Sequence, residues 1–427
     1  MILIKNGLVV DPANNRNEIL DILVDGIKIV QVAKDIQREA EEVIDAGGKI
    51  ILPGLVDMHV HLREPGREDK ETVETGTLAA VKGGITSVLA MPNTTPAPDC
   101  AEHVSLVKGI IQKTARANVY ICSTITFGRL GKELADTLTL KKEGVIAISD
   151  DGVSVDNEEL MSAAFKKAKE SQILVICHCE DKTLSANGAV NLGFTSTRLG
   201  LRGISRESEY KRIKRDIELA QKANASAHIA HVSCKESVEI IRDAKKRGVK
   251  VTSETAPHYF ALTEEDVLGY DTNKKMNPPL RGKEDVRAIK QGLSDGTIDA
   301  IASDHAPHTD NEKDIEFERA EFGVIGLETE LAVAITELIT HKILDWTGLV
   351  NKMSLSPAKI LGINKGTLSE GADADIIIVD ANKEWVVKKE DFVSRSKNSA
   401  FLGRKLKGIV EYTFCGGKIA YKNEPRL

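Results

Sequence analysis

The middle of this sequence, residues 53–355, alternates short apolar runs with segments of helical period, and this alternation constrains the fold more than any other feature. An apolar run of roughly four to eight residues between turn-forming residues predicts a buried strand, whereas a 3.6-residue apolar period predicts a helix. Eight such runs are present, ending near His59, Met91, Thr124, Ser149, His178, His231, Ser253 and Asp304. Helical patterns lie between or after them, for example over 158–170, 207–223, 236–247 and 328–340. Eight strand–helix units predict an α/β protein built on a (β/α)8 TIM-like barrel.

The two ends of the chain follow a different pattern. Residues 1–52 contain short strand-like runs separated by turn signals at 11–15 and 25–26. After about residue 355 strand patterns return at 376–379 and 411–414, with turn signals at 371–375 and 416–417. We therefore predict three segments: residues 1–52 and 356–427 form one small β-sandwich domain, and the barrel, 53–355, is inserted between them.

Composition excludes several classes of protein. The chain has 427 residues, 41% of them hydrophobic and 29% charged, with a net charge of −6. The negative charge leaves no basic footprint for nucleic acid, and no apolar run is long enough to span a bilayer. The first residues lack the pattern of a signal peptide. Six cysteines scattered through a chain of this length favour reduced thiols, so we expect a cytoplasmic protein with no nucleic-acid or membrane partner.

The first apolar run, 50–56, reads as one buried strand and leads into the sequence Asp57-Met58-His59-Val60-His61-Leu62-Arg63. Alternate residues of a strand point the same way, so His59, His61 and Arg63 are expected on one face. Two neighbouring imidazoles are a natural pair of ligands for a divalent transition metal. Arg63 is suited to a bidentate contact with an anionic substrate group. Taken alone, this stretch is also compatible with two structural core histidines.

Residues of metal-binding type follow several other predicted strands. They are Asp150, Asp151, His178, His231 and Asp304. In a (β/α)8 barrel the carboxyl ends of all strands face one rim, where active sites lie. One catalytic zinc usually takes three protein ligands, so four histidines and two aspartates suit two metals that share a bridging carboxylate and a water. Spacing leaves the choice between Asp150 and Asp151 open, because a turn begins there.

Several nearby residues are predicted to lie outside this centre. Cys177 and Cys179 flank His178 and should point the opposite way, as small buried hydrophobes. His305 should likewise point away from the metals. Arg281 is a candidate either for a second substrate contact or for a structural ion pair. The polar stretch 308–322, directly after the last barrel strand, is predicted to be a lid over the site.

These motifs resemble the amidohydrolase superfamily and, within it, the dihydroorotases of the bacterial type. The resemblance covers nearly the whole chain and rests on residues 53–66, 91–94, 149–152, 276–281, 302–308, 322–323 and 326–329. It implies two Zn²⁺ ions per chain, bridged by Asp151 and a hydroxide. The implied metal ligands are His59, His61, Asp151, His178, His231 and Asp304.

The resemblance also implies a reaction, namely the reversible cyclisation of N-carbamoyl-L-aspartate to L-dihydroorotate, the third step of pyrimidine biosynthesis. Asp304 would be the catalytic proton shuttle. The implied substrate-binding residues are His61, Arg63, Asn93, Asn277, His308, Phe322 and Gly323. A small-molecule substrate, a homodimer and an aspartate transcarbamoylase partner are further expectations.

Two alternatives are weighed against this prediction. One is another cyclic amidohydrolase, an allantoinase or dihydropyrimidinase. Hydantoinases, allantoinases and some dihydroorotases bridge their metals with a carboxylated lysine after the fourth strand, where this chain offers only Asp150 and Asp151. The other is a non-catalytic dihydroorotase-like scaffold for a transcarbamoylase. Such proteins lose metal ligands, whereas this chain keeps all six.

Overall fold

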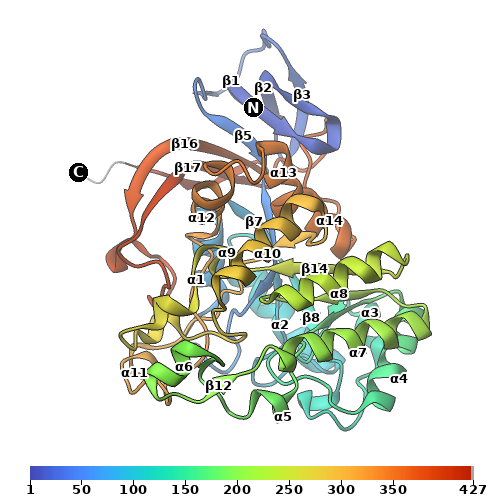
Figure 1. Ribbon diagram of the computed structural model, residues 1–427. Helices are drawn as coiled ribbons and strands as arrows, with labels where there is room; N and C mark the ends of the chain where they lie inside the picture. The colour runs from blue at the N-terminus through green and yellow to red at the C-terminus, as the bar shows by residue number, and fades with distance from the viewer. Residues whose placement is uncertain (425–427) are drawn as a thin grey trace.

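The computed structural model describes residues 1–424, and its centre is an eight-stranded sheet surrounded by helices (Figure 1). The neighbouring strands all run parallel, in the order β15-β14-β13-β10-β9-β8-β7-β6. They are β6 Leu55–Val60, β7 Ile85–Ala90, β8 Asn118–Ser123, β9 Ala147–Ile148, β10 Leu174–Cys177, β13 Ala227–Ile229, β14 Val251–Thr255 and β15 Ala300–Ile301. A parallel bridge between Val60 and His305 joins the two edges of this sheet. The predicted barrel is confirmed.

Helices cover the outside of the barrel. The main ones are α1 Val73–Lys82, α2 Ala101–Thr114, α3 Thr137–Lys142, α4 Glu158–Ser171, α7 Glu207–Ala223, α8 Lys235–Lys246, α10 Lys283–Asp295 and α14 Ser356–Leu361. The helix expected over 207–223 has those bounds, and α4 and α8 differ from prediction by one residue. The helix expected over 328–340 is instead divided into α12 Glu330–Ala334 and a π-helical turn, η5 Ile335–Ile339.

Shorter elements connect these units. Four-to-six-residue helices are α5 Lys182–Ser185, α6 Phe194–Leu199, α9 Pro257–Ala261, α11 Asp310–Lys313 and α13 Trp346–Val350. Single turns are η1 Pro12–Asn14, η2 Phe127–Arg129, η3 Glu264–Val267, η4 Thr272–Lys274, η6 Asn351–Leu355 and η7 Lys389–Asp391. A two-stranded sheet, β11 Val190–Asn191 with β12 Gly203–Ile204, lies in the connection before α7. Among residues 1–424, none of the helices has the length and apolar character needed to cross a membrane.

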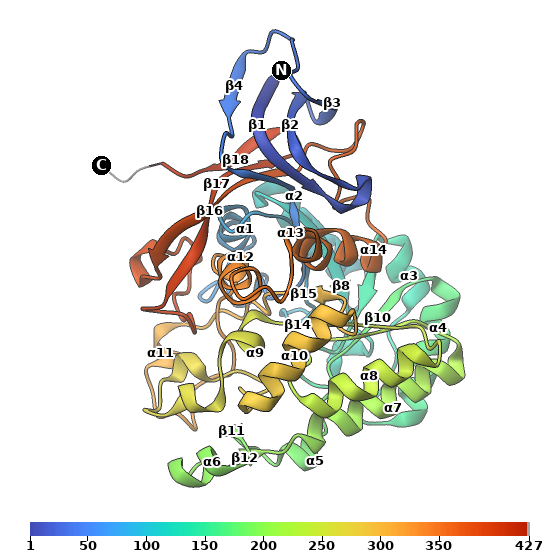
Figure 2. The ribbon, with the colours of Figure 1, turned by 45° about the horizontal axis from the view of Figure 1, so that its top comes forward.

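Strands from both ends of the chain form a second sheet, which Figure 2 shows beside the barrel. Its order is β18-β17-β16-β5-β1-β2-β3, with β4 paired to β1. The strands are β1 Ile2–Asp11, β2 Arg16–Asp25, β3 Lys28–Ala33, β4 Glu42–Asp45, β5 Ile50–Pro53, β16 Ile376–Val386, β17 Lys405–Cys415 and β18 Lys418–Lys422. Side chains from both termini, such as Ile22 and Phe414, share one core. The predicted terminal β domain is confirmed, while its boundaries after residues 52 and 355 stay a prediction.

The apolar run 50–56 does not form the single strand that the sequence predicts. It is divided at Gly54 into β5, which pairs with β16 in the terminal sheet, and β6, the first barrel strand. A Cβ at Gly54 would lie 2.1 Å from the Thr86 side-chain oxygen. Only a glycine can therefore pass between the two sheets at this point.

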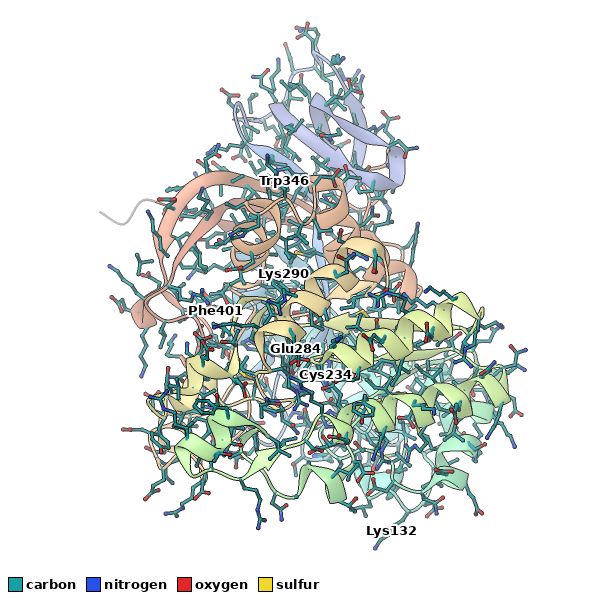
Figure 3. The ribbon with its side chains drawn as sticks, in the orientation of Figure 1. Lys132, Cys234, Glu284, Lys290, Trp346 and Phe401 are labelled. Carbon is teal, nitrogen blue, oxygen red and sulfur yellow. The ribbon has the colours of Figure 1, made fainter. Side chains whose placement is uncertain are left out.

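Helices α13 and α14 lie near the junction of the two sheets (Figure 1). The hydroxyl of Ser354 donates a hydrogen bond of 2.7 Å to the Gly54 carbonyl. Trp346, labelled in Figure 3, is partly buried and packs against the core of the barrel. The first barrel strand is thus held from the terminal-sheet side, and this position determines where the residues after it lie.

We expect Gly54→Ala to lower the free energy of unfolding by about 1–3 kcal/mol, because the added methyl group overpacks the contact with Thr86. The control is Gly109→Ala in α2, where a Cβ would meet no atom within 4 Å. That change should stabilise the helix by about 0.5–1 kcal/mol. Urea unfolding of both variants measures the difference, and equal stability of the two would contradict the close-packing argument.

Candidate active site

Imidazole and carboxylate groups from several strand ends meet at the carboxyl rim of the barrel. They belong to His59, His61, Asp151, His178, His231 and Asp304, each 9% exposed or less. Oδ1 of Asp151 lies 3.4 Å from Nε2 of His59, 3.3 Å from Nδ1 of His178 and 3.6 Å from Nε2 of His231. Oδ2 of Asp151 lies 3.5 Å from Nε2 of His61. Asp151 is therefore at the centre of the four histidines.

Two groups of three possible ligands share Asp151. One consists of His59, His61 and Asp151, and the other of Asp151, His178 and His231; within each group the ligand atoms lie within 4.8 Å of one another. Asp304 lies beside the first group, with Oδ1 3.4 Å from Nε2 of His61 and 3.7 Å from Nε2 of His59. This arrangement can hold two metal ions with one carboxylate between them.

The chemistry of these side chains fits divalent cations. Nε2 of His59 and Oδ1 of Asp151 are buried and have no hydrogen-bond partner within the described part of the chain. Burial raises the pKa of the Asp151 carboxyl, but the charge of His59 and the nearby imidazoles of His178 and His231 outweigh it and hold this pKa well below its ordinary value. The site thus offers an ionised carboxylate, the form that binds a metal, beside a buried imidazole nitrogen that has no hydrogen-bond partner in the described part of the chain.

The two neighbouring aspartates have different surroundings. Oδ1 of Asp150 accepts hydrogen bonds from the backbone N–H groups of Ile125 and Thr126, at 2.9 and 3.1 Å. The Thr126 hydroxyl donates to its other oxygen. Asp150 therefore holds the loop after β8 by hydrogen bonds, whereas the Asp151 carboxylate faces the four histidines. The geometry favours Asp151 over Asp150 as a metal ligand.

Two carboxylates behind the histidines were not identified from the sequence. The Nδ1–H of His59 donates a 2.7 Å hydrogen bond to Glu254, whose other oxygen lies 3.2 Å from Nε2 of His228. Glu180 lies 3.4 Å from Nε2 of His178. Burial raises the pKa of the Glu254 carboxyl, but hydrogen bonds to His228 and His59 have the larger, opposite effect. The resulting pKa is about 2. An acidic residue near the carboxyl end of a barrel strand, β14, was the signal available for Glu254.

Arg63 reaches the site by a different route from the predicted one. Strand β6 ends at Val60, so the alternation of a strand does not extend to Arg63, whose φ of 62° is left-handed. Its Nε–H donates to the carbonyl of Pro307 at 3.2 Å, and its Nη2 lies 3.3 Å from Nε2 of His308. Arg63 and His308 are thus side by side despite their separation in the sequence.

The remaining predicted substrate residues lie around the same rim. The Nδ1–H of His61 donates to the side-chain oxygen of Asn93 at 2.8 Å. Asn277 donates to Glu180 at 3.1 Å, which links it to the second metal-ligand group through His178. The carbonyl of Phe322 lies 2.8 Å from Nε2 of His308.

His308 has a defined hydrogen-bonding state. The Lys70 ammonium group donates to its Nδ1 at 3.0 Å, so Nε2 carries the proton that is donated to Phe322. Burial and the charges of Arg63 and Lys70 lower the pKa of His308 far below its ordinary value. A neutral imidazole with a fixed orientation therefore stands beside the Arg63 guanidinium.

Other residues singled out from the sequence lie elsewhere. His305 contacts Glu71 at 3.3 Å and turns away from the metal-ligand groups, as expected. Cys177 and Cys179 belong to the main hydrophobic core. Arg281 forms a buried ion pair of 3.3 Å with Glu209, which supports the structural role of the two roles considered for it.

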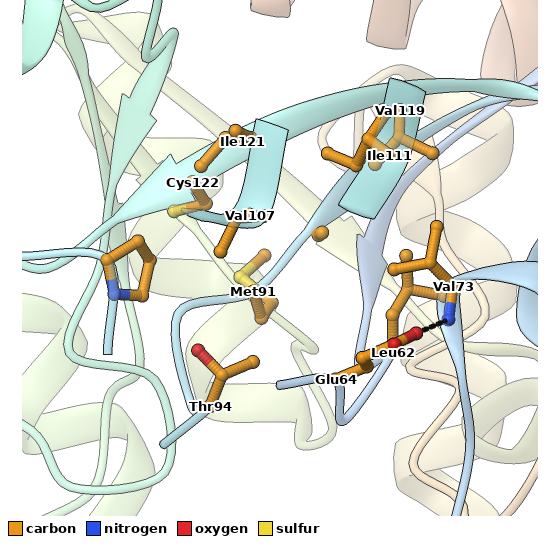
Figure 4. Close-up of a pocket in the computed structure, with 12 residues that line it drawn as sticks. Leu62, Glu64, Val73, Met91, Thr94, Val107, Ile111, Val119, Ile121 and Cys122 are labelled. Atoms are coloured by element: carbon orange, nitrogen blue, oxygen red, sulfur yellow. Dashed lines mark hydrogen bonds between the residues drawn. The ribbon is translucent and has the colours of Figure 1, made fainter. Parts of the chain in front are cut away.

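A small apolar pocket behind the site is separate from it. Figure 4 shows this cavity of about 10 Å³, lined by residues that include Leu62, Met91, Val107, Ile121 and Cys122. At its edge Glu64 accepts a 2.8 Å hydrogen bond from the Val73 N–H. The volume corresponds to about one water molecule and the walls are largely apolar, so the cavity is a packing defect rather than a ligand site.

Comparison with known proteins identifies the family. A family model described as Dihydro-orotase-like matches residues 48–237. The dihydroorotase of Elusimicrobium minutum is 53% identical over 421 residues, which cover 99% of this chain and 98% of the relative. The dihydroorotase of Geotalea daltonii is 52% identical over 424 residues, which cover 99% of this chain and 100% of the relative.

Among solved structures, the L-hydantoinase of Arthrobacter aurescens superimposes with a TM-score of 0.90 at 26% identity, covering 100% of this chain and 97% of that chain. The dihydropyrimidinase of Brevibacillus agri superimposes with a TM-score of 0.87 at 26% identity, covering 99% and 95%. The sequence relatives are far more similar than these fold neighbours. The chain therefore belongs to the dihydroorotase family of hydrolases.

Proposed function

We propose that this chain catalyses the reversible cyclisation of N-carbamoyl-L-aspartate to L-dihydroorotate, in pyrimidine biosynthesis. The observation that carries the proposal is the single carboxylate, Asp151, shared by two groups of metal-ligand type beside the Arg63–His308 pair. The first feature suits hydrolysis and formation of a cyclic amide. The second suits a substrate that carries a carboxylate away from the reacting bond.

The metal centre of this proposal consists of two Zn²⁺ ions. His59 and His61 would hold one ion, His178 and His231 the other, with Asp151 between them and Asp304 as the sixth ligand. When bound, such ions lower the pKa of a water molecule towards neutrality and polarise the carbonyl that it attacks. Nε2 of His59 and of His61 face Asp151, while each Nδ1–H is held by an acceptor. Such outer hydrogen bonds orient metal-binding imidazoles.

Asp304 is the proposed proton shuttle. Burial raises the pKa of its carboxyl, but the hydrogen bond to His61 and the charges of His59 and His231 outweigh it and keep this pKa below its ordinary value. The ionised carboxylate can accept a proton from the attacking water and deliver it to the leaving ring nitrogen. In the cyclisation direction the same oxygen takes the proton from the nitrogen.

Substrate recognition in this proposal uses opposite ends of the ring. Arg63, Asn93 and His308 would bind the carboxylate that does not react, the guanidinium by paired hydrogen bonds. Asn277, Phe322 and Gly323 would bind the amide edge of the ring. A ring without the carboxylate would leave Arg63 and its neighbours unpaired, and this penalty supports selection of dihydroorotate.

A second candidate is ring opening of a hydantoin or dihydropyrimidine, which the two solved fold neighbours favour. The residue after β9 argues against this candidate. The resemblance implies a carboxylated lysine there in hydantoinases, whereas this chain has Asp151 at that place. Hydrolysis of L-dihydroorotate, hydantoin, dihydrouracil and allantoin, followed by absorbance alongside metal analysis, decides between the two. We expect about two zinc ions per chain and turnover of dihydroorotate alone. Turnover of only another ring would overturn the substrate, and a metal-free, inactive chain would revive the scaffold alternative.

Three finer predictions concern the cellular context. A homodimer, a complex with aspartate transcarbamoylase and a cytoplasmic location all derive from sequence reasoning. The six cysteines are free, which supports a reducing compartment. The mass of the purified chain in solution, with and without that transcarbamoylase, tests both association predictions.

For the proton shuttle, we expect Asp304→Asn to lower kcat by about 10²–10⁴-fold, because the amide cannot accept the proton. Steady-state kinetics in both directions measure this loss, and metal analysis shows whether the other five ligands keep the ions. Asp310→Asn is the control, since Asp310 is an exposed residue of α11 that pairs with Lys389. Near-normal kcat in Asp304→Asn with full metal content would refute the shuttle.

For the outer carboxylate, we expect Glu254→Gln to weaken metal binding by about 10–100-fold, because the amide no longer attracts the Nδ1–H of His59 as an ionised carboxylate does. Competition with a chelator measures the affinity. Glu330→Gln is the matched control, because Glu330 is equally buried but lies on α12, and burial already raises its carboxyl pKa well above the ordinary value. Equal affinities in the two variants would show that Glu254 does not support the ligand.

A further inference from the structure

Two buried lysines, Lys275 and Lys313, hold residues 314–323, the segment that follows α11 and ends at Gly323 beside the site. Lys275 follows η4 and is 2% exposed. Its ammonium group donates hydrogen bonds of 2.8, 2.9 and 2.6 Å to the backbone carbonyls of Phe317, Glu318 and Ala320. All three protons of one lysine are thus used on one short stretch that has no helix or strand.

Lys313, the last residue of α11, holds the other end of the same segment and is 5% exposed. Its ammonium group donates to the carbonyls of Glu321 and Gly323 at 2.8 and 3.0 Å, and to the carbonyl of Lys275 at 3.4 Å. The Lys275 carbonyl also accepts a 3.0 Å bond from the Gly323 N–H. The two lysines and the segment therefore form one hydrogen-bonded unit.

Neither lysine is neutralised by an acidic side chain. Within residues 1–424, no carboxylate oxygen lies within 4.0 Å of either ammonium nitrogen. A buried cation without a counter-ion is costly, and backbone carbonyls compensate only part of that cost. The ring centroid of Phe322 lies 4.4 Å from Nζ of Lys275 and adds a favourable cation–π contact. An apolar side chain could fill the same space, but it would leave these backbone carbonyls without a donor, so the lysines are used to hold the segment.

The segment that the lysines hold is the one that orients His308. The Phe322 carbonyl accepts the hydrogen bond from Nε2 of His308. Gly323 has a φ of 124°, and a Cβ there would lie 2.7 Å from the Cβ of Ala306 and 3.2 Å from Nε2 of His308. Nε2 of His308 is in turn 3.3 Å from Arg63. A small displacement of the segment would therefore change the surroundings of both side chains.

We infer that Lys275 and Lys313 are positioning residues for substrate binding, which clamp residues 317–323 so that the Phe322 carbonyl orients His308 beside Arg63. The substrate side of this inference rests on the proposed function, whereas the clamp itself does not. The stretch expected to be a lid is, in this arrangement, held down by two specific side chains.

The test compares Lys275→Met and Lys313→Met with Lys274→Met. Methionine keeps much of the apolar stem and removes the charge and the donors. Lys274 is the matched control, because it is the neighbouring lysine and its ammonium group donates to the carbonyl of Ala400, outside the segment. Hydrogen exchange of peptides within 314–323 reports the clamp, and kcat and KM for L-dihydroorotate report binding.

We expect both variants to exchange at least about tenfold faster in this segment and to raise KM about tenfold, with a smaller change in kcat, because each loses charged hydrogen bonds that hold the segment. Lys274→Met should behave as the unmodified chain does. Lys313→Gln, which keeps two donors, should lie between these results, and it serves where a methionine variant folds poorly.

Two results would overturn the inference. Unchanged exchange in the segment would show that the lysines do not hold it. Faster exchange with unchanged KM would show that they hold it for stability alone. If the unmodified chain does not turn over dihydroorotate, the proposed function fails, and the exchange measurement still decides whether the clamp exists.

Discussion

The hydrogen bond from the backbone N–H of His61 to the carbonyl of His305, 2.9 Å long, is the contact on which the site depends. It joins the end of the first barrel strand to the end of the last, and so closes the sheet. The Asp57 carboxylate connects the same two strands, since it accepts from the N–H groups of His59 and Ser303 at 3.0 and 3.2 Å. Without this closure, Asp304 would lie at a sheet edge opposite to that of the first two histidines.

Closure brings the strand ends together, but the backbone must then turn sharply to aim their side chains inward. His231 and Asp304 have left-handed φ values of 36° and 49°, in a region that residues with a side chain seldom adopt. Such residues cost about 1–3 kcal/mol each and persist where the surrounding structure determines them. Here the continuous core beneath the rim supplies that support. The stability of the barrel therefore sustains a strained arrangement at its active rim.

The sequence predicts the barrel and most of the site because both depend on local patterns. Apolar strands of the right length reveal the fold, and the residue types after them reveal the metal-ligand groups. Strand alternation correctly pairs His59 with His61, but it fails at Arg63, because the strand ends at Val60 and a left-handed residue redirects the chain.

Contacts between residues far apart in the sequence are harder to predict from it. The division at Gly54 depends on the approach of Thr86 from the neighbouring strand. Glu254 contacts His59, which comes from another strand end, so the pattern of its own strand does not reveal that contact. Glu180 follows His178 by two residues, just after β10 ends at Cys177, and contacts that imidazole. Lys275 and Lys313 look like ordinary polar residues of a loop, and only the fold shows that their ammonium groups are buried.

The fold by itself does not explain which ring this chain accepts, because hydantoinase-type enzymes share the architecture at 26% identity. Selectivity has to come from side chains at the rim. Arg63 and Lys70 lie on either side of the His308 imidazole at one end of the site. Lys70 is also paired with Glu312 at 2.9 Å, whereas Arg63 has no acidic side chain within 4.0 Å among the described residues. In the proposed substrate complex a ring carboxylate would neutralise Arg63, whereas an unsubstituted hydantoin ring would leave that charge desolvated and unpaired. On the proposed function, discrimination against the uncharged ring would arise from the cost of that unpaired charge, and it would depend on how rigidly Arg63 is held.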